Sequence, residues 1–340
     1  MVKLSILDQS PIAKGLGPTE ALQQTTRLVQ EAEKLGYHRF WVSEHHHTYS
    51  LAGSSPEVLI PHLAAKTERI RLGSGGVMLP HYSAYKVAEN FQLLEALYPK
   101  RIDLGIGRAP GGMPIATRAL QEGKPRGVDL YPQQIDDLLH YIYQPDEQHR
   151  FADLKATPLT ATQPELWMLG SSYGSAGMAA AKGAAFAFAQ FINGDGGIAS
   201  VHGYQEQFRP SAAWREPYTM LAIFVICADT DAEADALASS LDLSLLLLEK
   251  GYTSAGGFPS PEEAKGYTYD AFDRSRVRHN RQRMVVGGPQ SVKQQLEMLQ
   301  QEYRADELMA VTITHDFEAK LHSYRLLAEQ FGLEKAEISS

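Results

Sequence analysis

The sequence has only one cysteine, Cys227, in 340 residues. A single thiol excludes an intramolecular disulfide and any zinc or iron–sulfur site built mainly from cysteines. This usage is typical of a reducing compartment, so we expect a cytoplasmic protein. No stretch approaches the roughly 20 consecutive apolar residues of a membrane span, and Met1 to Asp8 contains no apolar signal core. We therefore expect no membrane association.

Positive charge is also in short supply. Lysine and arginine number 32 against 40 aspartate and glutamate residues, which gives a net charge of -8. Because nucleic acids and anionic membranes are bound through basic surfaces, we expect neither as a partner. Small molecules remain the expected partners. The 44% of hydrophobic residues are enough for a large buried core.

Strand-like apolar runs alternate with amphipathic, helix-like stretches along nearly the whole chain. The predicted strands cover 3–7, 40–43, 70–79, 102–107, 166–169, 184–189, 218–226 and 308–313. The predicted helices cover 18–35, 56–66, 84–97, 132–143, 175–182, 198–208, 229–239, 291–301 and 317–331. Eight strands, nearly all followed by a helix, favour an α/β fold of the closed (β/α)8 TIM-barrel type, as a single domain over 1–340. An open doubly wound sheet is the alternative, but the chain lacks the compact GxGxxG turn after a strand that marks a dinucleotide-binding sheet.

Two segments interrupt this alternation. In Met113 to Ala161 we expect the helix 132–143 and then irregular chain over 144–161, with room for small strands. Leu243 to Arg283 follows the seventh strand and mixes glycine and proline with aromatic and basic residues. We interpret 243–283 as an excursion from the barrel that could act as a mobile lid, not as a second domain.

The second strand-like run ends in a carboxylate and three imidazoles, Glu44-His45-His46-His47. Adjacent residues of an extended chain point alternately to opposite sides, so His45 and His47 can share a face that His46 does not. Metal motifs on one element usually use helical spacing instead, so we expect no metal site here. A solvated strand-end cluster and a proton-handling histidine both remain open, since imidazole titrates near neutrality.

In a TIM barrel the functional residues follow the carboxyl ends of the strands. That rule brings a set of polar and glycine residues, far apart in sequence, to one rim. The set comprises Asp8, Glu44, His45, Gly75, Gly76, Arg108, Ser171, Ser172 and His315.

Two loops of this rim suit an anionic group. Arg108 follows a glycine-rich strand and precedes Pro110-Gly111-Gly112, and the turn 170–175 reads Gly-Ser-Ser-Tyr-Gly-Ser at a predicted helix start. Hydroxyls and free N–H groups at a helix start can cradle a phosphate beside an arginine. A rim salt bridge for Arg108 and plain helix capping by the serines are the alternatives.

Gly75 and Gly76 end the third predicted strand. Two glycines there allow a flat ligand to lie directly on the backbone, while a simple bulge is the other interpretation.

Four stretches together resemble the bacterial luciferase-like, flavin-dependent monooxygenases, and the likeness extends nearly from end to end. They are Trp41-Val42-Ser43-Glu44-His45-His46, the run 70–80 (IRLGSGGVMLP), the run 101–111 (RIDLGIGRAPG), and Gly170-Ser171-Ser172 with Ala187-Phe188-Ala189. Val286-Gly287-Gly288-Pro289 before a late helix adds to the match.

This resemblance implies a barrel that binds FMN or reduced FMN. Its phosphate would lie at Arg108, Ser172 and Ser175, next to Ser171, and its ring over a non-proline cis peptide at Gly75-Gly76. The resemblance also implies a catalytic role for His45. Glu44 would either set the tautomer of that histidine or pair with a cation inside the barrel. His46 would line the pocket and His47 would be solvated.

The resemblance further implies a homodimer that receives reduced FMN from a separate flavin reductase and uses O2 to oxygenate a small organic substrate. Light emission is not expected, because Gly107 stands where the light-emitting subunit carries a reactive cysteine. Two alternatives remain: a deazaflavin-dependent reductase or dehydrogenase on the same barrel, and a non-catalytic flavin-binding protein.

Overall fold

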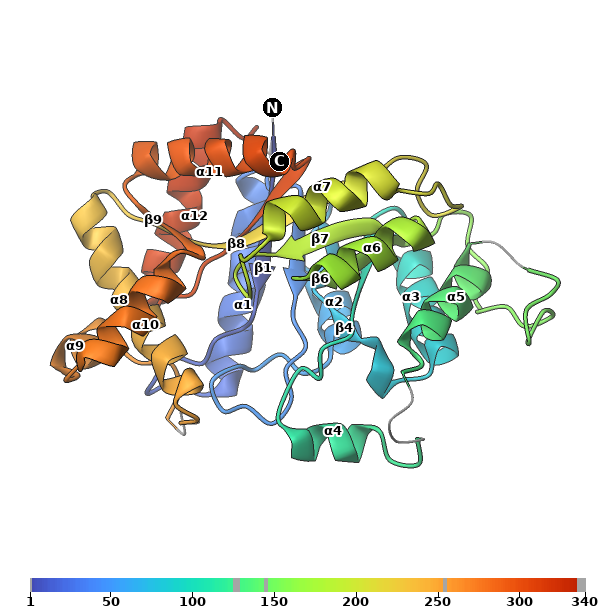
Figure 1. The fold of residues 1–340 in the computed structure, drawn as a ribbon, viewed down its shortest axis with the longest axis horizontal. Helices are drawn as coiled ribbons and strands as arrows, with labels where there is room; N and C mark the ends of the chain where they lie inside the picture. Colours follow the sequence, from blue (N-terminus) through green and yellow to red (C-terminus); the bar gives the residue numbers. More distant parts are fainter. Residues whose placement is uncertain (1, 125–128, 144–145, 253–255, 335–340) are drawn as a thin grey trace.

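The fold is described from a computed structural model that covers residues 2–124, 129–143, 146–252 and 256–334. Figure 1 shows a central ring of strands with helices around it. The ring strands are β1 (Lys3–Asp8), β2 (Arg39–Val42), β3 (Arg71–Ser74), β5 (Ile102–Gly107), β6 (Glu165–Gly170), β7 (Ala185–Ala189), β8 (Thr219–Cys227) and β10 (Glu307–Val311).

These strands close into a barrel. Each pairs in parallel with the next, and β10 pairs both with β8 and with β1. Glu307 of β10 lies opposite Lys3 of β1 on one side and opposite Met220 of β8 on the other. The predicted TIM barrel is therefore confirmed, and the open doubly wound sheet is wrong.

Long helices form the outer layer and follow the ring strands in sequence. They are α1 (Pro18–Lys34), α2 (Pro56–Ala64), α3 (Ala84–Leu97), α5 (Tyr131–Ile142), α6 (Tyr173–Lys182), α7 (Gly197–Gln207), α8 (Asp231–Glu249), α11 (Pro289–Tyr303) and α12 (Phe317–Phe331). No helix among the described residues is long and apolar enough to cross a membrane.

The alternation of side chains along β7 separates two cores. Phe186 and Phe188 pack outward against the helices, whereas Ala185 and Ala187 belong to the apolar cluster inside the barrel. Because successive strand residues face opposite sides, the large residues fill the helix layer and the small ones leave space in the interior.

Two structural features differ from the sequence expectations in the first half of the chain. The predicted strand 70–79 is interrupted at Gly75-Gly76, which are joined by a cis peptide bond, and it resumes as β4 (Val77–Met78) before the short 3-10 helix η1 (Leu79–His81). A short helix, α4 (Pro114–Leu120), lies in the less regular stretch that begins at Met113, where the sequence analysis predicted no helix before 132. No small strand occurs in 146–161, while 144–145 lie outside the described residues.

The second half also departs from expectation. Helix α8 continues ten residues beyond the predicted end at Ser239, because Leu243 and Leu246 are buried on it. The excursion contains the helices α9 (Pro261–Gly266) and α10 (Ala271–Arg281), while 253–255 lie outside the described residues. A strand that the sequence analysis missed, β9 (Met284–Gly287), pairs with Phe224–Cys227 of β8. β8 extends beyond its barrel neighbours β7 and β10, and its last residues pair with β9 instead.

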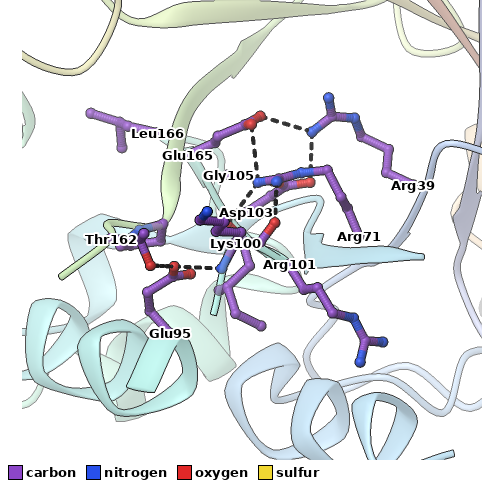
Figure 2. Close-up of polar contacts among 12 residues, drawn as sticks. Arg39, Arg71, Glu95, Lys100, Arg101, Asp103, Gly105, Thr162, Glu165 and Leu166 are labelled. Atoms are coloured by element: carbon purple, nitrogen blue, oxygen red, sulfur yellow. Dashed lines mark hydrogen bonds and ion pairs between the residues drawn. The ribbon is translucent and has the colours of Figure 1, made fainter. Parts of the chain in front are cut away.

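A buried charge network closes the amino-terminal end of the barrel (Figure 2). Arg39 is 2% exposed, and its guanidinium contacts Asp103 at 2.7 Å and Glu307 at 2.8 Å, while Arg71 contacts the second oxygen of Asp103 at 2.5 Å. Burial would raise the pKa of the Asp103 carboxyl, but Arg39 and Arg71 lower it overall. The indole N–H of Trp41 also donates to Asp103, at 2.9 Å, so the network fixes the position of this buried ring.

Candidate functional site: a pocket at the carboxyl ends of the strands

A pocket of about 560 Å³ lies at the carboxyl ends of the barrel strands. Its lining includes Glu44, His45, Gly75, Gly76, Arg108, Ser171, Ser172 and Ser175, which come from the ends of four strands. Hollows of about 700 Å³ over α8, α9 and α10, and about 680 Å³ beside α5, are larger. They contain none of the residues selected from the sequence, so the strand-end pocket is the candidate site.

The hydroxyl side of the pocket is built on the start of α6. Ser172 is the N-cap residue, and its Oγ accepts a hydrogen bond from the backbone N–H of Ser175 at 3.3 Å, while Ser175 Oγ lies 3.3 Å from the Ser172 N–H. A Cβ at Gly170 would lie only 2.1 Å from Ser175 Oγ, so this turn requires glycine. The partial positive charge of a helix start and two hydroxyls thus face the pocket.

Arg108 supplies the only cationic side chain among the described residues that line this pocket. It follows β5, the neighbour of β6, so the strand order brings it beside the serine turn. Its side chain is 62% exposed, and its contact is a 3.5 Å pair with Asp129, itself well exposed. Such an exposed pair contributes little, which leaves the guanidinium available for an anion.

Gly75 and Gly76 form a side of the pocket where the backbone itself is exposed to a ligand. A Cβ at Gly76 would lie 2.8 Å from the Gly105 carbonyl oxygen, and one at Gly75 would lie 2.7 Å from Leu7 Cδ1. A side chain at Gly76 would collide with the backbone of β5, and one at Gly75 would press on the side chain of Leu7, so the two glycines keep this surface flat. A flat surface of that kind suits a planar ring system.

His45 faces the pocket in its neutral form. Burial, and to a smaller extent the neighbouring His46, lowers its pKa from 6.5 to about 4. Near neutral pH the imidazole is therefore uncharged, with a proton on one of its two ring nitrogens. No hydrogen bond holds its ring among the residues that the structure describes.

Glu44 is one of the lining residues, and its buried carboxylate is fully engaged. It accepts hydrogen bonds from the Tyr82 hydroxyl at 2.9 Å and from the Met78 N–H at 3.1 Å, and it lies 2.7 Å from His46 Nε2. Burial, followed by the charge of Glu44, raises the pKa of Tyr82. Glu44 therefore contacts His46, not His45, and anchors β4 directly after the glycine pair.

Three other sequence-selected residues lie away from the pocket. His46 is not among the lining residues; its ring packs against His81 with centroids 5.7 Å apart. Asp8 is buried in an ion pair with Lys320 at 2.5 Å. His315 is also outside the lining.

His47 is exposed and points toward Tyr49, so the three histidine rings diverge. No group of three or more metal-ligating side chains gathers within the described part of the chain.

The pocket also has lining residues that the sequence analysis missed. They are mostly apolar or small, and include Leu7, Gln9, Trp41, Met78, Ala187, Ala189, Phe191, Ile192, Ala222 and Met309. The alternation in β7 was a usable signal, because its small residues at every second position face the barrel interior. The guanidinium of Arg283 fixes part of this wall by donating to the carbonyl oxygens of Phe191, at 3.3 Å, and Ile192, at 2.5 Å.

Comparison with known proteins gives a consistent result. The family model described as luciferase-like monooxygenase matches residues 2–306. The uncharacterised Bacillus subtilis protein YwcH is 55% identical over 98% of this chain and 100% of its own length. The N-acetyl-S-alkylcysteine monooxygenase of the same organism is 39% identical over 97% of this chain and 98% of its own length. The crystal structure of apo-MsnO8 superposes with a TM-score of 0.89 at 36% identity, covering 99% of this chain and 100% of that one.

More distant structures share the fold. The oxygenating constituent of the 3,6-diketocamphane monooxygenase of Pseudomonas putida, solved in complex with FMN, has a TM-score of 0.69 at 19% identity and covers 97% of this chain and 98% of that one. An F420-dependent secondary alcohol dehydrogenase has a TM-score of 0.64 at 13% identity, with coverage of 98% and 99%. The extent of the family match and the identity to curated monooxygenases place this chain among flavin-dependent oxidoreductases, and it belongs to the luciferase-like monooxygenase family.

Proposed function

We propose that this protein is an FMN-dependent monooxygenase that uses O2 to oxygenate a small organic substrate. The observation that carries the proposal is the arrangement of one pocket: an arginine and a hydroxyl-bearing helix start after β5 and β6, a flat glycine pair after the neighbouring β3, and a neutral histidine after β2, the next strand along. These match the three parts of FMN chemistry, which are a phosphate, a planar ring and a proton to be moved.

The residues fit FMN on two further points. The glycine pair gives the pocket a stretch of lining without side chains, against which a planar ring can lie. Ser43 lines the pocket, and its Oγ is buried without a hydrogen-bond partner among the described residues, which fits a site that a polar ligand completes. Arg108, Ser171, Ser172 and Ser175 would hold the phosphate, and Gly75 and Gly76 would support the ring.

Reduced FMN, when bound, supplies the electrons that activate O2 for transfer of one oxygen atom. The protein's own groups support this in two ways. His45, neutral at working pH, accepts or returns a proton at its free ring nitrogen. Phe191 and Ile192, held by Arg283, and the indole of Trp41 limit the access of water to the ring.

Several further properties belong to this proposal. The excursion 243–283, whose helices α9 and α10 lie at the left of the molecule in Figure 1, acts as a lid. A separate flavin reductase supplies reduced FMN, and the protein works in the cytoplasm. It is a homodimer, and the exposed Leu93 and Leu97 on one face of α3 are suited to the contact. Sedimentation of the wild type against Leu93→Lys tests the dimer.

Two relatives support the choice of monooxygenase over the alternatives: a curated protein named N-acetyl-S-alkylcysteine monooxygenase and a fold neighbour solved with FMN. The F420-dependent fold neighbour keeps a deazaflavin reductase or dehydrogenase as the second candidate. Comparing the affinities for FMN and for the deazaflavin separates the two. A non-catalytic flavin-binding protein predicts that His45→Ala changes no flavin reaction.

The proposed reaction is tested by supplying the protein with FMN, a flavin reductase, isotopically labelled oxygen gas and a panel of small organic compounds. We expect one labelled oxygen atom in the product of at least one compound. Reduction or dehydrogenation of a compound without label would favour the deazaflavin-type alternative.

A further inference from the structure

The order of the strands places one wall of the pocket directly across the barrel from the glycine pair. In the closed ring β8 lies four strands from β3 in either direction. Gly75 and Gly76 follow β3, and Ala222 of β8 lines the same pocket. A planar ring resting on the glycines therefore presents its other face to the β8 side of the barrel.

This opposite wall is made of small residues. Ala187 and Ala189 on β7 and Ala222 on β8 line the pocket, and they are between 3% and 7% exposed. The other inward-facing residues of β8 are Met220, Phe224 and Ile226, whereas the inward face of β7 carries only alanine. Ala189 and Ala222 are partners in the register of β7 and β8, and Ala187 is the preceding inward-facing residue of β7. Because a barrel interior of this size is otherwise filled by side chains, these small residues on adjacent strands leave a recess.

The recess is closed by apolar neighbours. Leu7 and Met309 come from the adjoining strands β1 and β10, and Phe191 comes from the loop after β7. Phe191 packs on Phe224 with ring centroids 5.3 Å apart. Gln9 adds the one hydrogen-bonding side chain on this arc within the described lining, and its amide is uncharged.

The charges of the pocket lie elsewhere. Among the described lining residues the charged side chains are Arg108, after β5, and Glu44, after β2. The proposed phosphate site uses the first, and three hydrogen bonds occupy the second. An ionised substrate group placed against Ala222 would lose its hydration without gaining a counter-ion.

We propose that the recess of Ala187, Ala189 and Ala222 is the substrate subsite, and that it takes an uncharged, mainly apolar group that packs over the ring. This inference rests on the proposed function, because the ring defines the open side of the recess. Gln9 would hydrogen-bond a neutral polar atom of the substrate, such as a carbonyl oxygen. Ala222 would set the size limit.

The test compares three probes of similar length, methyl hexyl ketone, octanoate and octylamine, on the FMN-loaded protein at pH 8. Dissociation constants are measured by calorimetry, and FMN affinity separately by flavin fluorescence. We expect the ketone to bind at least about tenfold more tightly than either charged probe. Equal or tighter binding of octanoate or octylamine would overturn the proposal.

Variants at Ala222 test whether the preference for the ketone arises in the recess. Ala222→Leu should weaken ketone binding by about tenfold or more, whereas FMN affinity changes by less than about threefold. Ala222→Arg should reverse the preference toward octanoate. Ala199→Arg, at an exposed position on α7, is the matched control and should change neither. Ketone binding that is insensitive to both Ala222 variants would overturn the assignment.

An error in the proposed function can be told apart from an error in the substrate subsite, because FMN binding is measured separately. If the wild-type protein binds no FMN in the fluorescence titration, the FMN proposal is wrong. The same three probes are then measured on the flavin-free protein. If the ketone no longer binds more tightly than octanoate and octylamine, the proposal that the recess takes an uncharged group is wrong as well.

Discussion

The carboxylate of Glu44 lies 2.7 Å from the ring of His46 and does not contact the adjacent His45. The same carboxylate accepts hydrogen bonds from Tyr82 and from the backbone of Met78, just after the glycine pair. Glu44 is therefore a positioning residue for the pocket wall. Its buried carboxylate joins two segments, by contacting His46 on its own loop and both Met78 and Tyr82 on the other.

Replacing Glu44 should accordingly affect stability more than proton chemistry. Glu44→Ala leaves the Met78 N–H and the Tyr82 hydroxyl unpaired and should lower the free energy of unfolding by on the order of 3 kcal/mol. Glu44→Gln keeps an acceptor and should cost about 1 kcal/mol. Urea denaturation of the two variants checks this, and equal losses would show that the hydrogen bonds are not the cause.

Arg108 should discriminate between flavins that do and do not carry a phosphate. Arg108→Ala removes a charge-assisted contact and should weaken FMN binding by on the order of 2 kcal/mol. Riboflavin has the same ring without the phosphate, so its affinity should not change. Fluorescence titrations of both ligands on both proteins give the comparison. An equal loss for FMN and riboflavin would remove Arg108 from the phosphate site.

His45 should make the protein sensitive to acid. Its pKa is about 4 in the folded protein and 6.5 as the reference value for the unfolded chain, so between these values the unfolded state binds more protons. Stability therefore falls as the pH drops from 6.5 toward 4, by on the order of 2 kcal/mol once partial exposure is allowed for. His45→Gln should remove that part of the slope in denaturation curves measured across this range.

His38 is the matched control for the histidine measurement. Its pKa is also lowered to about 4, mainly by burial, but it lies just before β2, at the amino-terminal end of the barrel. His38→Gln should reduce the acid sensitivity of stability as well, yet leave flavin reactions unchanged. If both variants alter flavin oxidation equally, the assignment of proton transfer to His45 is wrong.

The two glycines of the flat surface should differ in their tolerance of a side chain. Gly76→Ala places a Cβ 2.8 Å from a backbone oxygen of β5, which moves only if the barrel does. Gly75→Ala meets the end of the Leu7 side chain, which can rotate away. We expect the greater loss of FMN affinity, about tenfold or more, in Gly76→Ala. Similar affinities in the two variants would contradict the steric account.

The barrel strands and the helices between them could be predicted, because the spacing of apolar residues indicates each element and their alternation along the chain indicates the barrel. Seven of the predicted strands have close counterparts, and the rule that function follows strand ends brought Glu44, His45, Arg108 and the serine turn to one pocket. The eighth, 70–79, is split because two adjacent glycines interrupt the pairing. β9 is only four residues long, and its strand conformation depends on pairing with the end of β8. These two segments are far apart in sequence, so a local sequence pattern does not reveal the pairing.

The residues that shape the pocket were harder to predict than those that carry its charge. Glu44 was identified, but its partners Tyr82 and Met78 come from a segment more than thirty residues further along the chain. Ala222 and Met309 look like ordinary core residues in sequence, and only barrel closure brings them to the pocket. His46 was expected to line the pocket, but its ring is drawn to the carboxylate of Glu44.

The central claim is that the pocket binds reduced FMN and controls its reaction with oxygen. Rapid mixing of the anaerobic protein–FMN complex with O2, against free reduced FMN, tests this most directly. We predict that the oxidised-flavin spectrum returns later with the protein than without it, and that His45→Ala changes the delay. Identical time courses with and without protein, at concentrations where FMN is bound, would contradict the account.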